Sequence, residues 1–174
     1  EPGPRFEAFH GGFGLMNTQG IKKPAYFAYQ FLNQLGHTEL KNKDKDSWAT
    51  VDDQGNAQVL LWDYTHTLPA GVNNQQFFVK DLPPKDKGQV AVSLRGLKPG
   101  AYTMSVSEVG YKRNDAFTAY VGIGSPRQLS RTQVASLKKE ASGKAARQEA
   151  LTVAADGHLR TTLPLRENDV YLLQ

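Results

Sequence analysis

Side chains that could do acid–base, nucleophilic or metal chemistry are spread along the chain without the spacing that such chemistry needs. The sequence has four histidines and no cysteine, which excludes disulfides, thiolate nucleophiles and thiolate metal ligands. The histidines are His10, His37, His66 and His158. Because no second histidine or carboxylate stands at metal-ligand spacing from any of them, we predict structural or solvated roles, no metal site and no cofactor.

Three short motifs invite a chemical interpretation that turn geometry also explains. Asp63 and His66 could pair at the end of a strand, but turn hydrogen bonding explains both equally well, and we favour it. The glycine runs at 11–14 and 122–124 lack the phosphate-binding fingerprint and the nucleophile elbow. We therefore interpret them as tight passages of the backbone.

The elements that would position these residues begin with a helix after a glycine-rich loop. Pro24 suits a first helical position, and Gly36 suits the left-handed residue just past a helix end. Between them Phe27, Phe31 and Leu35 are spaced four apart, which makes an apolar stripe. We predict a helix whose stripe is buried against a larger body.

After Gly36 the pattern changes to two-residue alternation between turns. Asp52 to Asn56 predicts a hairpin between strands at 48–51 and 57–64, and Asp156-Gly157 predicts another between 151–153 and 158–163. Further expected strands cover residues 76–79, 89–94, 102–109 and 170–173. Seven or more short strands at this spacing indicate an antiparallel β-sandwich.

A long excursion from Tyr111 to Gly143 interrupts the strands. Ser130 and Gln133 form a capping box, and Val134, Leu137 and Ala141 follow as a narrow apolar stripe, so we predict one surface helix here. Connections of this length usually carry function or contact another domain.

Several motifs along the chain resemble those of a known family. The motifs on which the resemblance rests are Phe9-His10-Gly11-Gly12-Phe13-Gly14-Leu15, Gln19-Gly20-Ile21-Lys22-Lys23-Pro24-Ala25, Val59-Leu60-Leu61-Trp62-Asp63-Tyr64-Thr65, Val109-Gly110-Tyr111-Lys112-Arg113-Asn114-Asp115 and Leu163-Pro164-Leu165-Arg166-Glu167-Asn168-Asp169. Together they resemble the end of the catalytic barrel and the C-terminal β-sandwich of glycoside hydrolase family 39 β-xylosidases.

The resemblance implies two regions and a partner. Residues 1–36 would be the last loop and helix of a (β/α)8 barrel that is otherwise missing, and residues 37–174 the sandwich. Glu1 would lie near the family's sugar-binding acidic pair, although for this chain we favour a disordered terminal residue. Contacts with the barrel are expected from the first helix and the excursion, at Phe27, Phe31, Leu35, Tyr111, Asn114, Asp115, Phe117 and Tyr120.

Glycoside hydrolysis needs two carboxyl groups, about 5 to 5.5 Å apart for retention. The family's pair lies at the ends of the fourth and seventh barrel strands, one within an Asn-Glu-Pro run that is absent here. Six glutamates lie in loop, strand or surface-helix contexts that match neither motif. They are Glu7, Glu39, Glu108, Glu140, Glu149 and Glu167. We therefore assign no catalytic residue and expect the chain alone to be inactive, as the C-terminal, non-catalytic portion of a retaining β-xylosidase.

Two other functions stay open, a free-standing carbohydrate-binding module and a purely structural domain. The first would use exposed aromatic rings for xylan or xylo-oligosaccharides, with Trp48, Trp62, Tyr64, Tyr102, Tyr111, Phe117 and Tyr120 as candidates. A core role is favoured for Trp62 and Tyr102. A homo-oligomer is also open.

Composition argues against two further classes of protein, those that bind nucleic acids and those that span a membrane with a helix. The net charge of +4 comes without a basic stripe interleaved with aromatic residues, which argues against nucleic-acid binding. No apolar run approaches the length of a membrane span, about 18 residues. The compartment stays open between bacterial cytoplasm, periplasm and secretion.

Overall fold

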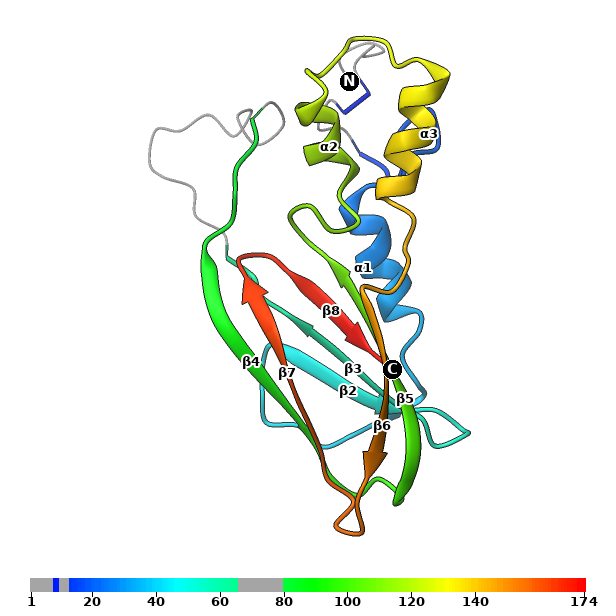
Figure 1. Cartoon of the computed structure of the whole chain (residues 1–174), viewed down its shortest axis with the longest axis vertical. Helices are drawn as coiled ribbons and strands as arrows, with labels where there is room; N and C mark the ends of the chain where they lie inside the picture. The colour runs from blue at the N-terminus through cyan, green and yellow to red at the C-terminus, as the bar shows by residue number, and fades with distance from the viewer. Residues whose placement is uncertain (1–7, 10–12, 66–79) are drawn as a thin grey trace. The chain divides into compact units, whose positions relative to one another are not determined.

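The computed structural model describes residues 8–9, 13–65 and 80–174. The chain forms two compact units, each built from separated stretches. We call Glu1–Asn33, His66–Pro83 and Val109–Gly143 the helical unit, and Gln34–Thr65, Pro84–Glu108 and Lys144–Gln174 the sandwich unit (Figure 1). The first boundary lies close to the division expected at Gly36, but two later segments belong with the N-terminal one.

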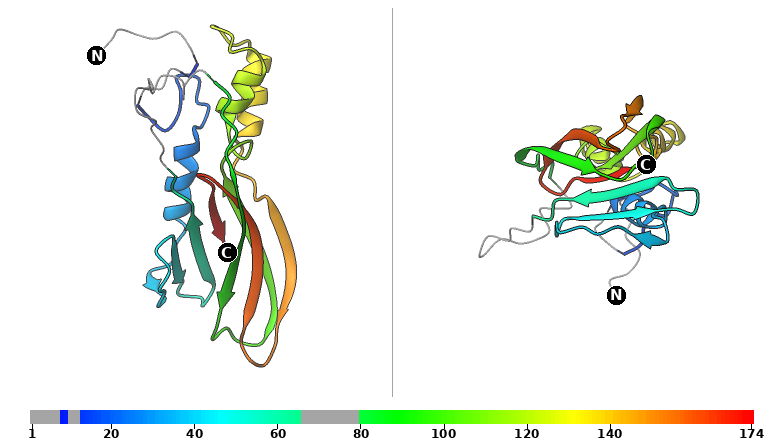
Figure 2. Two further views of the ribbon diagram at one scale, coloured as in Figure 1. Left: turned by 90° about the vertical axis from the view of Figure 1, so that its left-hand side faces the viewer. Right: turned by 90° about the horizontal axis from the view of Figure 1, so that it is seen from below.

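The sandwich unit holds all eight strands found in the described residues. They are β1 (Thr38–Glu39), β2 (Ser47–Val51), β3 (Ala57–Trp62), β4 (Asp86–Leu94), β5 (Gly100–Val109), β6 (Arg147–Val153), β7 (Leu159–Arg166) and β8 (Val170–Leu173). One sheet has the order β1-β2-β3-β8-β5-β6, and the other consists of β4 and β7 (Figure 2). The predicted antiparallel β-sandwich is confirmed.

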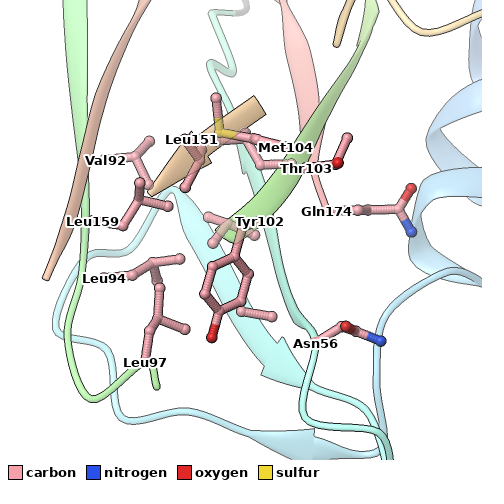
Figure 3. A pocket seen from close by; sticks show the side chains of 13 residues that line it. Asn56, Val92, Leu94, Leu97, Tyr102, Thr103, Met104, Leu151, Leu159 and Gln174 are labelled. Atoms are coloured by element: carbon pink, nitrogen blue, oxygen red, sulfur yellow. The ribbon is translucent and has the colours of Figure 1, made fainter. Parts of the chain in front are cut away.

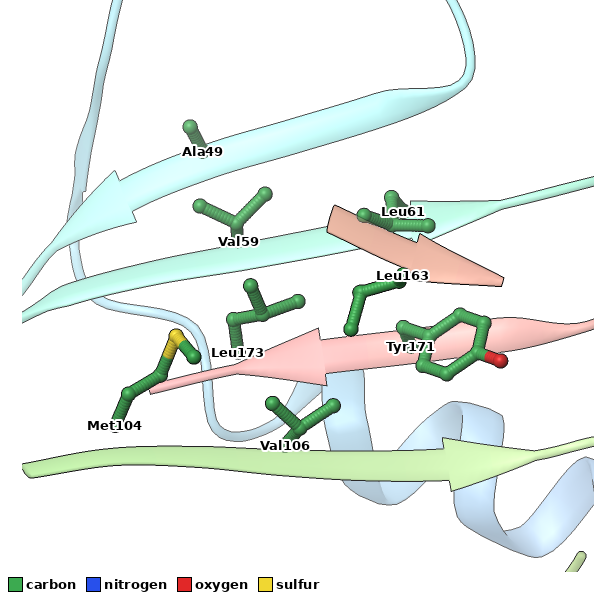
Figure 4. Packing of buried hydrophobic residues seen from close by; sticks show 8 residues of the cluster. All are labelled: Ala49, Val59, Leu61, Met104, Val106, Leu163, Tyr171 and Leu173. Atoms are coloured by element: carbon green, nitrogen blue, oxygen red, sulfur yellow. The ribbon is translucent and has the colours of Figure 1, made fainter. Parts of the chain in front are cut away.

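The core lies between the two sheets. Val59, Leu61, Val106 and Leu163 are buried in one cluster with four further side chains (Figure 4). That cluster is Ala49, Val59, Leu61, Met104, Val106, Leu163, Tyr171 and Leu173. Leu172 is fully buried as well, but it alternates with Tyr171 and Leu173 along β8 and so belongs to the opposite face of the sheet.

The hairpin predicted at Asp52 to Asn56 is confirmed, whereas the one predicted at Asp156-Gly157 is wrong. β2 and β3 pair along their length, but β6 pairs with β5 and β7 with β4. The turn at Gly157 therefore carries the chain from one sheet to the other. It lies against the turn between β4 and β5, where Leu97 N–H donates to Gly157 O at 3.1 Å.

The helical unit contains α1 (Pro24–Leu32), α2 (Ala116–Gly122) and α3 (Arg131–Glu140). Pro24 begins α1 as predicted, and Ser130 and Gln133 form the predicted capping box of α3. The excursion carries α2 in addition to the one expected helix. Its N-cap is Asp115, whose side chain accepts from Thr118 N, a local pattern that the sequence does contain.

The first helix ends earlier than predicted, and Gly36 has a different role. Asn33 is the C-cap of α1, so Leu35 lies beyond the helix. A Cβ on Gly36 would stand 2.4 Å from the carbonyl carbon of Val51. Glycine is needed there because two backbones approach closely, not because a helix ends in a left-handed residue.

Candidate functional site

Asp115 and Tyr120, two of the predicted interface residues, stabilise their own unit. The Asp115 carboxylate is buried and accepts from Lys112 N and Thr118 N, each at 3.1 Å. Tyr120 is 3% exposed and donates its hydroxyl to Pro126 O at 3.1 Å. Both side chains therefore hold the excursion together and are not available to a partner.

An aromatic cluster and a glycine contact complete this packing. Phe9 lies 6.1 Å from Phe117 and 5.1 Å from Tyr120, measured between ring centroids. Asn114 Oδ1 accepts from Gly143 N at 2.8 Å. A Cβ on Gly143 would lie 3.1 Å from the Phe27 ring, so α1 packs against the end of the excursion.

The remaining interface candidates differ in exposure. Phe27 and Phe31 are buried, at 0% and 2%, as expected for two of the three residues of the predicted stripe. Leu35 and Tyr111 are half-buried, and the Tyr111 hydroxyl donates to Asp81 at 3.1 Å. Glu1, His10, His66 and the strand expected at 76–79 lie outside the described residues.

No described group of three or more His, Asp or Glu side chains could hold a metal ion. His158 Nε2 instead lies 2.7 Å from Ser93 Oγ and accepts from Arg160 Nε at 3.3 Å. The described helices are all too short or too polar to cross a membrane.

The main polar cluster of the sandwich unit centres on Arg166. Its Nε and one terminal nitrogen contact the two oxygens of Asp169 at 2.9 and 3.0 Å, and the same terminal nitrogen contacts Glu108 at 3.0 Å. Asp169 is 0% exposed and Glu108 8%. Hydrogen bonding to Asp169 raises the pKa of the Arg166 guanidinium despite its partial burial. Both carboxylates are therefore bonded to the one cation between them.

Tyr171 borders this network from β8. Burial raises the pKa of its phenol strongly, and the negative charges of Glu108 and Asp169 raise it further. The neutral phenol is therefore the form that the folded sandwich favours.

The turn from Arg166 to Asp169 joins β7 to β8. It forms hydrogen bonds and an ion pair with residues at three distant points of the chain. Arg166 binds Glu108. Glu167 exchanges hydrogen bonds with Lys85, since Lys85 N donates to Glu167 Oε2 and Glu167 N to Lys85 O, both at 3.0 Å. Asn168, held at φ 62°, accepts from Thr65 N at 3.1 Å.

Those three points are where the chain leaves or enters the sandwich unit. Thr65 and Glu108 are the last residues before two crossings to the helical unit, and Lys85 follows Pro84 at the return from the first. One four-residue turn therefore anchors three of the five crossings between the units. We call it the anchoring turn.

Asp63 belongs to the same arrangement, as the turn interpretation predicted. It accepts from Asn168 N at 3.0 Å and Thr65 Oγ1 at 2.8 Å, and lies 3.4 Å from Lys87 Nζ. Burial acts to raise the pKa of Asp63, but these hydrogen bonds and the lysine charge outweigh it, so the pKa is lowered.

Sequence reasoning missed the anchoring turn. Its four residues stand inside one of the motifs that carry the family resemblance, and the Arg-x-x-Asp spacing is a local pattern. The partners, however, lie 58 to 103 residues away.

The aromatic candidates of the sandwich unit do not form a platform. Trp48 is 42% exposed and Tyr64 77%, while Trp62 and Tyr102 are half-buried. The Tyr102 hydroxyl donates to Lys98 O at 2.8 Å. Among the described residues, the ring–ring contacts all fall within the helical unit.

Tyr102 also borders a small apolar cavity of about 70 Å³ between the sheets (Figure 3). Aliphatic side chains such as Val92, Leu94 and Leu159 line most of it, and Asn56 and Gln174 add amides. Its lining contains no carboxylate, histidine or lysine side chain, and the hydroxyl of Tyr102 is already bonded to Lys98 O.

Comparison with known proteins agrees with this non-catalytic architecture. Residues 1–160 match the model of glycosyl hydrolases family 39. A β-xylosidase of Caldicellulosiruptor saccharolyticus is 31% identical over 139 residues, 75% of this chain and 25% of that protein. A β-xylosidase of Geobacillus stearothermophilus is 26% identical over 95% of this chain and 29% of its own length.

Solved structures of the same family are also similar to this chain. A family 39 enzyme from Xanthomonas axonopodis pv. citri superposes with a TM-score of 0.92 at 36% identity, and a monomeric β-xylosidase from Caulobacter crescentus with 0.91 at 39%. Each match covers 99% of this chain but only 34% of the other. The chain therefore belongs to glycosyl hydrolase family 39 and corresponds to the non-catalytic C-terminal portion of that family's enzymes.

Proposed function

We propose that this chain supports a retaining β-xylosidase, with its helical unit contacting a catalytic barrel and its sandwich unit holding that helical unit in place. The anchoring turn is the observation that carries the proposal, because one partly buried ion pair and two exposed hydrogen bonds hold the points where the chain passes between units. The named relatives that share this region are β-xylosidases.

The carboxylates support an accessory role. Glu108 and Asp169 are the close buried pair, but both are bonded to Arg166. A retaining mechanism needs one carboxyl group that is protonated and one that is a free nucleophile. Two carboxylates that share one guanidinium are poorly suited to either role, which favours hydrolysis by other groups of the enzyme.

The exposed apolar side chains of the helical unit are the surface we assign to the barrel. They are Phe13, Leu15, Met16, Tyr29, Leu32, Leu82 and Ile123, each at least 38% exposed, and Phe117 and Tyr111 of the same unit are half-buried. Where such side chains form a contiguous patch, they are typical of an interface. The buried candidates Phe27, Phe31, Asp115 and Tyr120 would shape this surface from beneath.

Complementation tests the proposal. The Caulobacter crescentus β-xylosidase, cut so that it lacks the matched C-terminal third, is mixed with this chain, and hydrolysis of an aryl β-xyloside is measured. We expect no turnover from the chain alone and a gain in turnover from the mixture. Tyr29→Asp should reduce the gain, whereas Tyr64→Asp, the same change on the sandwich unit, should not.

Two results would overturn the proposal. One is turnover by the purified chain that depends on one of its own carboxylates. The other is binding of xylotriose to the isolated chain that quenches the fluorescence of Trp48, with no effect of the chain on the truncated enzyme. The second result would favour a carbohydrate-binding module.

A further inference from the structure

Three polar side chains meet on the outer face of the small sheet, which β4 and β7 form. Ser93 and Arg160 are partners in the strand register, so their side chains lie on the same face. His158 stands two residues before Arg160 and shares that face. Val92 and Leu94, on either side of Ser93, pack against the core instead. Ser93 and Arg160 are exposed and His158 is half-buried, and we call these three residues the His158 cluster.

The hydrogen bonds of the His158 cluster show which nitrogen of the neutral ring carries the proton. Arg160 Nε lies 3.3 Å from His158 Nε2, and Ser93 Oγ lies 2.7 Å from the same nitrogen. An arginine side chain can only donate, so Nε2 is unprotonated and accepts, and the ring proton is on Nδ1. Ser93 then donates to Nε2 as well. Two donors therefore converge on one acceptor.

A proton on Nε2 takes that shared acceptor away. Histidine gains its second proton between about pH 5 and pH 8, and both ring nitrogens are then donors. The oxygen of Ser93 can accept from the charged ring, which turns the Ser93 O–H outward, but Arg160 Nε loses its partner in the cluster. The imidazolium also stands beside the guanidinium, and like charges at this distance repel. The protonated cluster therefore lacks a negatively charged acceptor.

The backbone holds the ring in place without a ligand. His158 N donates to Asp156 Oδ1 at 3.1 Å, and Leu97 N donates to Gly157 O at 3.1 Å. A Cβ on Gly157 would lie 2.6 Å from Leu97 O, so the two turns are closely packed. A ligand of the cluster would therefore have little backbone to order, and ordering is one of the main costs of binding.

The charged residues of the two turns at this end of the sheet are mostly cations. Asp156 is in the turn that contains Gly157, and its carboxylate already accepts from His158 N. Arg95 and Lys98 are in the facing turn between β4 and β5. With Arg160, this end of the sheet carries three permanent cations and one carboxylate, a balance that attracts anions.

We propose that the His158 cluster binds an oxyanion, such as a sulfate, phosphate or carboxylate group, together with a proton on His158. Arg160 supplies a permanent positive charge and its Nε–H, and Ser93 supplies a hydroxyl donor. The bound anion replaces the lone pair that protonation removes and lies between the two cations. Because binding is reciprocal, the proton raises the affinity for the anion by the factor by which the anion raises the affinity for the proton. The site does not depend on the barrel-supporting role proposed above.

Sodium sulfate is the first probe, because sulfate keeps its charge across the range in which histidine titrates. It is added to the chain at about pH 5.5 and about pH 8, on either side of the histidine titration, with sodium chloride holding the ionic strength constant. Binding is read by NMR from the His158 ring and from the backbone amides of Ser93 and Arg160. We expect saturable binding that is about tenfold or more tighter at the lower pH.

A second probe and an internal reference define the ligand. Acetate is titrated in the same way, and whichever of the two anions saturates the signals shows whether the cluster takes tetrahedral anions, carboxylates or both. His37 is exposed in the same unit, and its ring signals should show no saturation by either anion.

Three variants assign the effect to individual side chains. His158→Gln keeps a side-chain donor but cannot titrate, so binding read from the Ser93 amide should no longer depend on pH. Arg160→Gln should weaken sulfate binding at the lower pH by about tenfold or more, because a hydrogen bond from a charged donor is lost. Arg147→Gln removes the same charge from the exposed pair with Glu149 on the other sheet, and should leave the affinity unchanged.

Three outcomes would overturn the inference. The first is that neither anion saturates the signals of the cluster. The second is equal affinity at the two pH values, which would separate anion binding from the proton on His158. The third is an equal response of His37, which would mean that anions associate with the chain without a site. The titrations of the unaltered chain decide the question even where a variant does not fold.

Discussion

Replacing Arg166 by methionine should destabilise the sandwich unit by about 3 kcal/mol. The change leaves two buried carboxylates, Asp169 at 0% and Glu108 at 8% exposure, without their shared cation. Breaking a buried ion pair by removing one partner costs about 3–5 kcal/mol. The Arg166 side chain is 30% exposed, so water reaches part of the site and the lower end applies.

Urea unfolding measures this loss as a lower midpoint at unchanged slope. Arg147→Met is the control, since Arg147 and Glu149 form a pair at 3.6 Å with both side chains about 40% exposed, and such pairs contribute about 0–1 kcal/mol. Arg166→Lys should recover only part of the stability, because an ammonium cannot make the two-pronged contact with Asp169. A loss below about 1 kcal/mol for Arg166→Met would refute this reasoning, because it would mean that water can solvate the two carboxylates in place of the guanidinium.

Three further changes test the core, a close backbone contact and the buried phenol. Leu61→Ala should cost about 2–4 kcal/mol in urea unfolding, because Leu61 is 4% exposed and a cavity would remain; an unchanged midpoint would contradict the core assignment. Gly36→Ala should destabilise by about 1–3 kcal/mol through its clash with Val51, whereas Gly122→Ala, where a Cβ meets nothing within 4 Å, should be neutral or stabilising by up to about 1 kcal/mol. Folding raises the pKa of Tyr171, so its contribution to stability is complete below about pH 10, the ordinary pKa of tyrosine, and is lost as pH rises above that; unfolding midpoints in alkaline buffers should fall less steeply for Tyr171→Phe.

Local sequence chemistry predicted those elements whose cause is local. The Asp52 turn is an example, because its carboxylate accepts from Gln54 N at 3.0 Å and Asn56 N at 2.8 Å, within the turn itself. The capping box at Ser130 is another, since both of its hydrogen bonds span three residues. In each case the residues that specify the element are the residues that form it.

Strand pairing was predicted less well, because a turn motif shows where the chain reverses but not which strand it then joins. Asp156-Gly157 has the composition of a hairpin turn, and His158 N does donate to Asp156 Oδ1 at 3.1 Å. The strands on either side nevertheless enter different sheets. The deciding contact comes from Leu97, about 60 residues earlier, and no local pattern contains it.

Gly36 shows how one residue type can be predicted for the wrong reason. A glycine that follows an apolar stripe is typical of a helix end, but here the chain continues past the helix and passes the backbone of Val51. Gly36 N also donates to Thr50 Oγ1 at 2.9 Å and to Gln58 Oε1 at 3.1 Å. Glycine is required because the backbone at Gly36 passes close to the backbone of Val51. The sequence around Gly36 does not show this contact.

The charged side chains around the anchoring turn are bonded to one another. A catalytic carboxylate has to remain able to change its protonation or attack a substrate, whereas Glu108 and Asp169 are committed to Arg166, and Asp63 to Asn168, Thr65 and Lys87. The bonds of Glu108, Thr65 and Lys87 lie at or beside a crossing of the chain. Buried charge of this kind contributes little net stability compared with apolar packing, but its geometry is specific. In this chain the charge therefore helps to fix the points at which the chain leaves and re-enters the sandwich unit.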